Sequence, residues 1–170
     1  MMLNDRYYLE CANIIQRSAD LANSFLIAPP EDAYRGYMNI LNNLPLASSI
    51  PMFDPLEGSF EGFPGIVVST GPSLEKSLDW LKKVQDRAVV ACADSALKIL
   101  LKAGIVPHFV GCLERVPQTE YYFTDLPPLP DTWLLSDPLI WPKTHQIYPG
   151  PKIFMMRYLG QLKWFFSETK

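Results

Sequence analysis

Residues 65–115 read GIVVSTGPSLEKSLDWLKKVQDRAVVACADSALKILLKAGIVPHFVGCLER. The segment alternates short runs of small and β-branched residues, such as 65–69 and 88–93, with longer amphipathic runs. A short β-branched run is typical of a strand buried on both faces of a parallel sheet, and an amphipathic run is typical of a helix. Strand–helix–strand units require right-handed parallel crossovers. The pattern therefore predicts an α/β domain with a Rossmann-like, doubly wound, mostly parallel sheet.

The individual elements follow from the same periodicities. Strands are expected at 65–69, which we place inside the sheet, and at 88–93, 108–113, 132–136 and 152–156. A helix that begins at Ser73 would pack through Leu74, Leu78 and Leu81. A second helix at 95–103 would end at Gly104, since glycine is the residue that most readily takes the left-handed conformation after a helix.

The sequence on either side of this sheet is different in character. Helices are expected at 4–26 and at 31–44, the latter ending before Pro45, and an irregular connector is expected at 45–64. We therefore divide the chain into an α-helical N-terminal extension with its connector, 1–60, and a Rossmann-like domain, 61–170. A further helix at 158–166 is rich in aromatic residues. We expect that the natural protein continues beyond Lys170, which makes this chain a fragment, or that a homo-oligomer buries this helix.

Charge and cysteine content exclude several classes of function. The chain has 15 basic and 18 acidic residues and a net charge of -3, so it lacks the basic field that a nucleic-acid partner requires. Its three cysteines are an odd number without metal-ligand spacing, which favours neither disulfides nor a metal site and indicates a reduced, cytoplasmic setting. No apolar run approaches the roughly 18 residues of a membrane span, so a membrane is not an expected partner.

Polar residues follow each predicted strand, and in a parallel sheet the carboxyl ends of the strands form the edge at which ligands bind. The turn at 69–73 leads into a helix N-terminus, where backbone N–H groups and the helix dipole favour a phosphate, and Gly71 permits close approach. The alternative is that Ser73 only caps the helix. The candidate binding residues are Ser69, Thr70, Gly71, Pro72, Ser73, Leu74, Asp94, Ser95, Arg115, Ser136 and Asp137.

The turn differs from two common nucleotide motifs. It has one glycine where the dinucleotide fingerprint GxGxxG has three, and no Gly-Lys-Ser/Thr of a Walker loop follows. Asp94 is placed to accept hydrogen bonds from a ribose, or to cap the following helix together with Ser95. As candidate catalytic residues we take Glu114 and His145, with Asp137 as a further candidate base. Cys112 is interpreted as a small core residue.

Two blocks, GIVVSTGPSL at 65–74 and DSALKILLKAGIVPHFVGCLER at 94–115, resemble the motility accessory factor family of flagellin glycosyltransferases. That family is related to the 6-hydroxymethylpterin diphosphokinase-like proteins. Its GPSL-type turn is similar to the turn with which bacterial sialyltransferases hold a cytidine-monophosphate sugar. The resemblance implies that residues 71–74 hold the nucleotide, that Asp94 and Ser95 lie beside the ribose or sugar, and that Glu114 stands at the sugar.

The same resemblance implies an activity and its partners. These are a cytidine-monophosphate-linked donor, transfer of an acidic nine-carbon sugar, and serine or threonine of flagellin as the acceptor. One alternative is a diphosphokinase-like enzyme that uses magnesium, although the chain has a single carboxylate, Glu114, where such enzymes commonly present paired aspartates. The other is a nucleotide-sugar-binding module without catalysis, so whether the chain is an enzyme stays open at this point.

Overall fold

The computed structural model describes residues 5–26, 30–47 and 49–155. Internal contacts divide the chain into two units, Met1–Arg35 and Gly36–Lys170. The first unit contains helix α1, Asp5–Leu26, which confirms the predicted N-terminal helix. The helix predicted at 158–166 lies outside the described residues. None of the described helices combines the length and the apolar character needed to cross a membrane.

Helix α2, Pro30–Ala47, continues through Pro45, so the predicted end before this proline is wrong. Pro45 lacks the backbone N–H that would bond to residue 41, and because it lies two residues before the end of the helix, little of the helix follows it. Buried side chains hold the helix in place. Asn39 donates to the carbonyl oxygens of Arg115 and Leu139, and Asn43 donates to those of Pro138 and Ile140.

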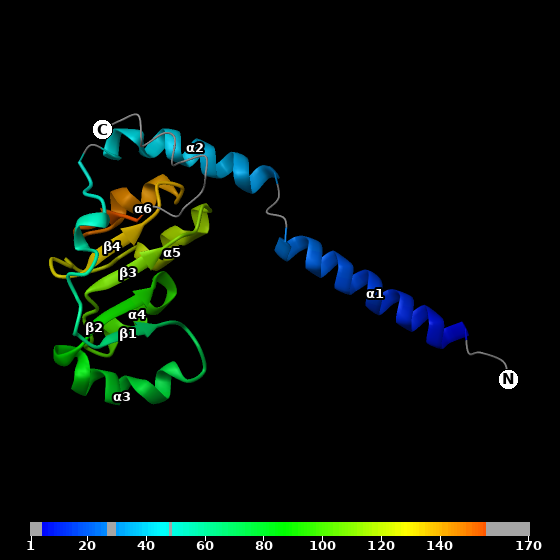
Figure 1. Cartoon of the computed structure of the whole chain (residues 1–170), viewed down its shortest axis with the longest axis horizontal. Coiled ribbons are helices and arrows are strands. Elements are labelled where there is room, and N and C mark those ends of the chain that lie inside the picture. The colour runs from blue at the N-terminus through cyan, green and yellow to red at the C-terminus, as the bar shows by residue number, and fades with distance from the viewer. Residues whose placement is uncertain (1–4, 27–29, 48, 156–170) are drawn as a thin grey trace. The chain divides into compact units, whose positions relative to one another are not determined.

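The second unit is built on a five-stranded parallel sheet with the order β1-β2-β3-β4-β5. The strands are β1 (Gly65–Val68), β2 (Val89–Ala93), β3 (Phe109–Cys112), β4 (Trp133–Ser136) and β5 (Lys152–Phe154). All four pairings are parallel, and Figure 1 shows β1 to β4 following one another in chain order. The predicted α/β, Rossmann-like class and all five strands are confirmed. Strand β1, however, lies at an edge of the described sheet and not inside it.

Helices α3 (Leu74–Val84), α4 (Asp94–Lys102), α5 (Glu120–Phe123) and α6 (Pro142–Ile147) connect these strands, with 3-10 turns η2 (Gln85–Arg87) and η3 (Pro117–Thr119). The first two were predicted. Helices α5 and α6 were not predicted, because four and six residues are too few to establish a helical period. Gly104 has a φ of 74°, which confirms its predicted role at the end of α4.

The order of the strands determines which face the helices cover. The described strands follow the chain without a reversal, and right-handed crossovers then bring the connecting helices to the same face. The predicted doubly wound order, which requires a reversal of strand order, is therefore not present in the described sheet. On that face Val90, Val110 and Leu134 pack with Leu81 of α3 and Leu100 of α4 in one core. Each such side chain contributes roughly 1.5–3 kcal/mol by leaving water. The predicted packing of α3 through Leu74, Leu78 and Leu81 is confirmed.

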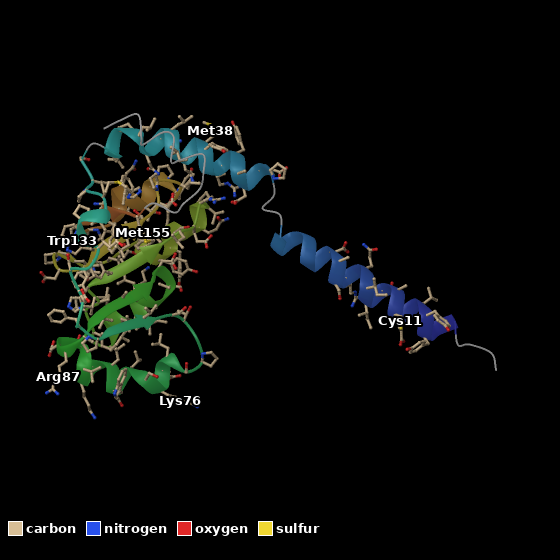
Figure 2. The ribbon with its side chains drawn as sticks, in the orientation of Figure 1. Cys11, Met38, Lys76, Arg87, Trp133 and Met155 are labelled. Carbon is tan, nitrogen blue, oxygen red and sulfur yellow. The ribbon has the colours of Figure 1, made fainter. Side chains whose placement is uncertain are left out.

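The opposite face of the sheet is partly exposed. Val67 is 86 % exposed and Trp133 is 37 % exposed. The side chain of Trp133 can be located in Figure 2. Phe109 on the same face is shielded by the ring of Phe60, with centroids 5.6 Å apart. The expectation that β1 is buried on both faces is therefore wrong for Val67, although Val68 on the other face is buried.

The edge of β5 is closed by the segment that follows α2. Met52 forms a parallel bridge with Phe154. The N–H of Phe53 donates to the carbonyl oxygen of Phe154 at 2.8 Å, and the N–H of Phe154 donates to that of Pro51 at 2.8 Å. The predicted irregular connector thus contains a short strand-like contact, followed by the 3-10 turn η1, Asp54–Leu56. These contacts place the end of α2 beside β5.

Candidate functional site

The turn at 69–73 lies at the carboxyl end of β1 and leads directly into α3. All five of its residues are exposed. The N–H of Leu74 donates to the carbonyl oxygen of Gly71 at 2.9 Å, which forms the tight turn. A Cβ atom built on Gly71 would meet nothing within 4 Å, so the space beside this backbone is open. The Leu74 N–H is used in this turn, so a phosphate would approach the other N–H groups of the first turn of α3, which have no acceptor within the helix.

Ser73 does not cap α3 through its side chain. Its backbone is already helical, with φ -82° and ψ -17°, and its hydroxyl makes no capping hydrogen bond. Its carbonyl oxygen accepts a hydrogen bond from Ser77 Oγ at 3.0 Å. The interpretation of Ser73 as only a helix cap is therefore wrong. The exposed hydroxyl is at the helix N-terminus, where it can donate to an anion.

The first two strand ends are joined by a pair of hydroxyl groups. Thr70 Oγ1 and Ser95 Oγ are 3.0 Å apart, and this hydrogen bond links the turn after β1 to the first turn of α4. Asp94 Oδ1 accepts the N–H of Ser95 at 2.6 Å. The predicted grouping of Thr70, Asp94 and Ser95 at one edge of the sheet is thus present in the structure.

Asp94 also faces residues at the end of β3. Burial raises the pKa of the Asp94 carboxyl, and the negative charge of Glu114 raises it further. Hydrogen bonds from the Ser95 N–H and from the Cys112 thiol act in the opposite direction. Burial also raises the pKa of Cys112 to about 12, so this residue remains a thiol and a donor at neutral pH. The site therefore contains two interacting carboxyl groups, from the ends of neighbouring strands.

Glu114 and Arg115 have different surroundings. The side chain of Glu114 is exposed, and its carbonyl oxygen accepts the N–H of Trp141 at 3.2 Å. Arg115 is half-buried, and its Cδ atom lies 3.4 Å from the position that a Cβ on Gly36 would take. Glu114 therefore faces the solvent near Asp94, whereas the Arg115 side chain packs along α2.

Ser136 and Asp137 do not lie on the exposed edge where the sequence analysis placed them. Both are 0 % exposed, because the loop after β4 is covered by the second half of α2. Asp137 Oδ1 accepts the N–H of Leu139 at 2.9 Å and so shapes this loop. The Asp137 carboxylate therefore has a structural contact in this loop, whereas the buried Ser136 hydroxyl has no hydrogen-bond partner among the described residues.

His145 is also separate from the other candidates. It lies on α6, is buried, and packs edge-to-face on Phe154 of β5, at the far edge of the sheet from β1. Four strand spacings of about 4.8 Å separate these edges. We therefore do not place His145 among the groups that act at the turn. Cys112, predicted as a core residue, is fully buried, and the described residues contain no cluster of three or more metal-ligating side chains.

The structure shows features that the sequence analysis missed. The carboxyl groups of Asp94 and Glu114 interact, and the Cys112 thiol contacts Asp94. The position of Asp94 directly after β2 and of Glu114 two residues after β3 was a usable signal, because parallel strand ends lie side by side. Asn39 and Asn43, four residues apart on α2, were a second signal, because this spacing places both amides on one face of the helix.

The fold and this edge define an α/β protein of the Rossmann-like class with an exposed turn before a helix, suited to binding phosphate. The family model described as "6-hydroxymethylpterin diphosphokinase MptE-like" matches residues 38–170. The chain belongs to this MptE-like family. This confirms the relation to 6-hydroxymethylpterin diphosphokinase-like proteins that the sequence blocks at 65–74 and 94–115 indicated.

A solved structure described as the MAf glycosyltransferase from Magnetospirillum magneticum AMB-1 is similar with 20 % sequence identity and a TM-score of 0.44. The match covers 58 % of this chain and 17 % of that one, so the present chain corresponds to a small part of that protein. A search among curated proteins gave no match.

Proposed function

We propose that the edge formed by the turn at 69–73, Asp94 and Glu114 binds a nucleotide monophosphate sugar, in a glycosyltransferase-type reaction. The observation that carries this proposal is the exposed turn at the start of α3, connected through Thr70 and Ser95 to the carboxylate of Asp94. The turn and the N-terminus of α3 would hold the phosphate. Asp94 would accept hydrogen bonds from ribose or sugar hydroxyls.

The proposed reaction transfers an acidic nine-carbon sugar from a cytidine-monophosphate donor to serine or threonine of flagellin. The acceptor oxygen forms a bond to the anomeric carbon while the bond from that carbon to the phosphate oxygen breaks. The hydroxyl proton goes to Glu114, the exposed carboxylate of the site, and the leaving phosphate keeps the electron pair. Backbone dipoles at the turn would stabilise the charge on the leaving phosphate.

Binding of cytidine monophosphate, measured by calorimetric titration, tests the proposal. Gly71→Val and Ser73→Pro are each expected to weaken binding at least tenfold. The first places a branched side chain in the open space beside the turn, and the second removes a hydroxyl and a backbone N–H. A hydrogen bond to a charged group contributes about 1.5–3 kcal/mol, which is about 10- to 150-fold in affinity.

Gly65→Val is the matched control, because Gly65 lies at the amino end of β1 and its Cβ position is also open. This variant should bind like the unchanged chain. Absence of heat and of a thermal shift with millimolar cytidine monophosphate would overturn the proposal. Binding without sugar transfer would support the module that binds but does not catalyse.

The paired carboxylates favour a second candidate, a diphosphokinase-like activity. The charge of Glu114 acts on Asp94 at the carboxyl ends of β2 and β3, so Glu114 is accompanied by a second carboxyl group. Carboxylate oxygens are ligands that Mg²⁺ accepts together with substrate phosphates. Magnesium-dependent formation of a pterin diphosphate, lost in Asp94→Asn, would favour this candidate over sugar transfer.

A further inference from the structure

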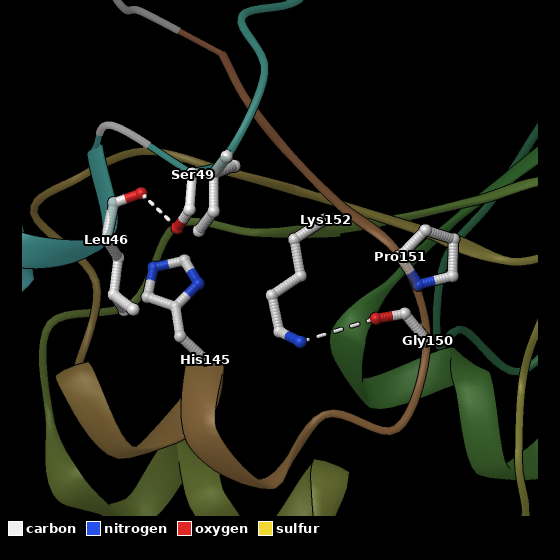
Figure 3. Close-up of a pocket in the computed structure, with 7 residues that line it drawn as sticks. Leu46, Ser49, His145, Gly150, Pro151 and Lys152 are labelled. Carbon is white, nitrogen blue, oxygen red and sulfur yellow. Dashed lines mark hydrogen bonds between the residues drawn. The ribbon is translucent and has the colours of Figure 1, made fainter.

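A pocket of about 290 Å³ lies at the other edge of the sheet, between the end of α2, α6 and the start of β5. Figure 3 shows His145 and Lys152 facing the same space from different elements. Leu46, Ile50 and Pro151 provide apolar surface, whereas Ser49, His145 and Lys152 provide polar groups. The pocket is separate from the turn after β1, so it does not depend on the proposed function.

His145 is the feature that points to an occupant. It is 3 % exposed, and neither of its ring nitrogens has a hydrogen-bond partner among the described residues. Its ring packs edge-to-face on Phe154, with centroids 5.3 Å apart. A buried polar group without a partner costs about 1–3 kcal/mol, and such groups normally have one. An imidazole that lines a pocket can find that partner in a bound molecule.

Lys152 gives the pocket its charge. Its Nζ donates to the carbonyl oxygen of Gly150 at 3.3 Å, which leaves further donors for a ligand. Its positive charge acts on the imidazole, since it contributes to the lowered pKa of His145. Ser49 Oγ donates to the carbonyl oxygen of Leu46 at 3.0 Å. The Ser49 hydroxyl proton is therefore already in a hydrogen bond. The side-chain groups of the pocket that can still donate to a ligand are the Lys152 ammonium and the His145 imidazole.

We propose that this pocket binds a small organic anion, a carboxylate with a short hydrocarbon part. The ammonium of Lys152 and the imidazole N–H of His145 would both donate to the carboxylate oxygens, and a charged hydrogen bond of this kind is stronger than a neutral one. The hydrocarbon part would lie on Leu46, Ile50 and Pro151. The pocket volume is close to the lower end of small-molecule sites, which suits a ligand of a few carbons.

Titration of the full chain with sodium butyrate at constant ionic strength tests this proposal, with inorganic phosphate as a second probe. Saturable butyrate binding is expected. Lys152→Met should weaken it at least tenfold, and His145→Phe should do the same while it retains the ring contact with Phe154. Lys143→Met is the matched control for the loss of a lysine charge. Lys143 is exposed on α6, the helix that contains His145, and its Nζ pairs with Glu120 Oε2 at 3.1 Å. This control should bind butyrate normally.

The outcomes separate the possibilities. A shift of the His145 imidazole resonances on adding butyrate, absent in Lys152→Met, supports the proposal. Phosphate binding without butyrate binding overturns the organic class. Binding that survives Lys152→Met overturns the site. If neither probe binds a chain that is folded by circular dichroism, the proposal fails.

Discussion

Gly150→Ala is expected to lower the free energy of unfolding by about 3 kcal/mol. A Cβ at this position would collide with the carbonyl oxygens of Leu129 and Thr132, the latter at 2.8 Å, and with the Tyr148 ring at 2.9 Å. Two of these three neighbours are backbone atoms, which cannot move aside as a side-chain end can. Overpacking of this kind typically costs 1–3 kcal/mol, and backbone shifts place this case at the upper end.

Urea denaturation followed by circular dichroism measures this effect. Gly65→Ala is the control, because its Cβ position has no neighbour within 4 Å, and we expect a change within about 0.5 kcal/mol. Equal stability of the two variants would show that the loop around Gly150 relaxes without cost. It would also contradict the close packing of this loop against the carbonyl oxygens of Leu129 and Thr132.

Acidification from pH 7 to pH 4 is expected to destabilise the protein through His145, by on the order of 3 kcal/mol. Burial, together with the charge of Lys152, lowers the pKa of His145 to about 4, from an ordinary value of 6.5. As the pH falls, the unfolded chain takes up this proton first. The free energy of unfolding therefore decreases between pH 6.5 and pH 4, and the contribution of His145 levels off below that.

The comparison with His145→Phe isolates this contribution. The pKa of Asp94 is raised, so this carboxyl favours the folded state as the pH falls and acts against the effect of His145. Because both proteins contain Asp94, the difference between their pH profiles reports on His145. Denaturation midpoints measured from pH 7.5 to pH 4 should fall more steeply in the unchanged chain. Parallel profiles would contradict the buried, neutral imidazole.

The sheet was largely predictable from the sequence because its signals are local. Short β-branched runs and amphipathic runs located all five strands and helices α3 and α4, and Gly104 marked the end of α4. The position of β1 at an edge was not predictable, since a run such as 65–69 has the same composition inside a sheet and at its border. The prediction at Pro45 was wrong because the energetic cost of a proline in a helix depends on how far it lies from the helix end. The hydrophobic periodicity does not show where the last turn of α2 ends.

The candidate site was predictable only in part, for a related reason. The turn at 69–73 and Asp94 follow directly from strand ends, so their neighbourhood could be derived from the topology. The burial of Asp137 and His145 depends on where α2 and α6 pack, and this is determined by contacts such as Asn43 with Pro138 and Ile140. Contacts between residues nearly a hundred positions apart leave no periodic signal.

The two edge strands of the described sheet differ in whether their outer backbone groups are hydrogen-bonded. The backbone of β5 is occupied by the segment around Met52, whereas β1 is paired on one side, with β2, among the described strands. An edge strand presents unpaired N–H and C=O groups to any extended chain that approaches. Among the described residues, β1 is therefore the border of the sheet with backbone groups left for a further strand, next to the exposed Val67.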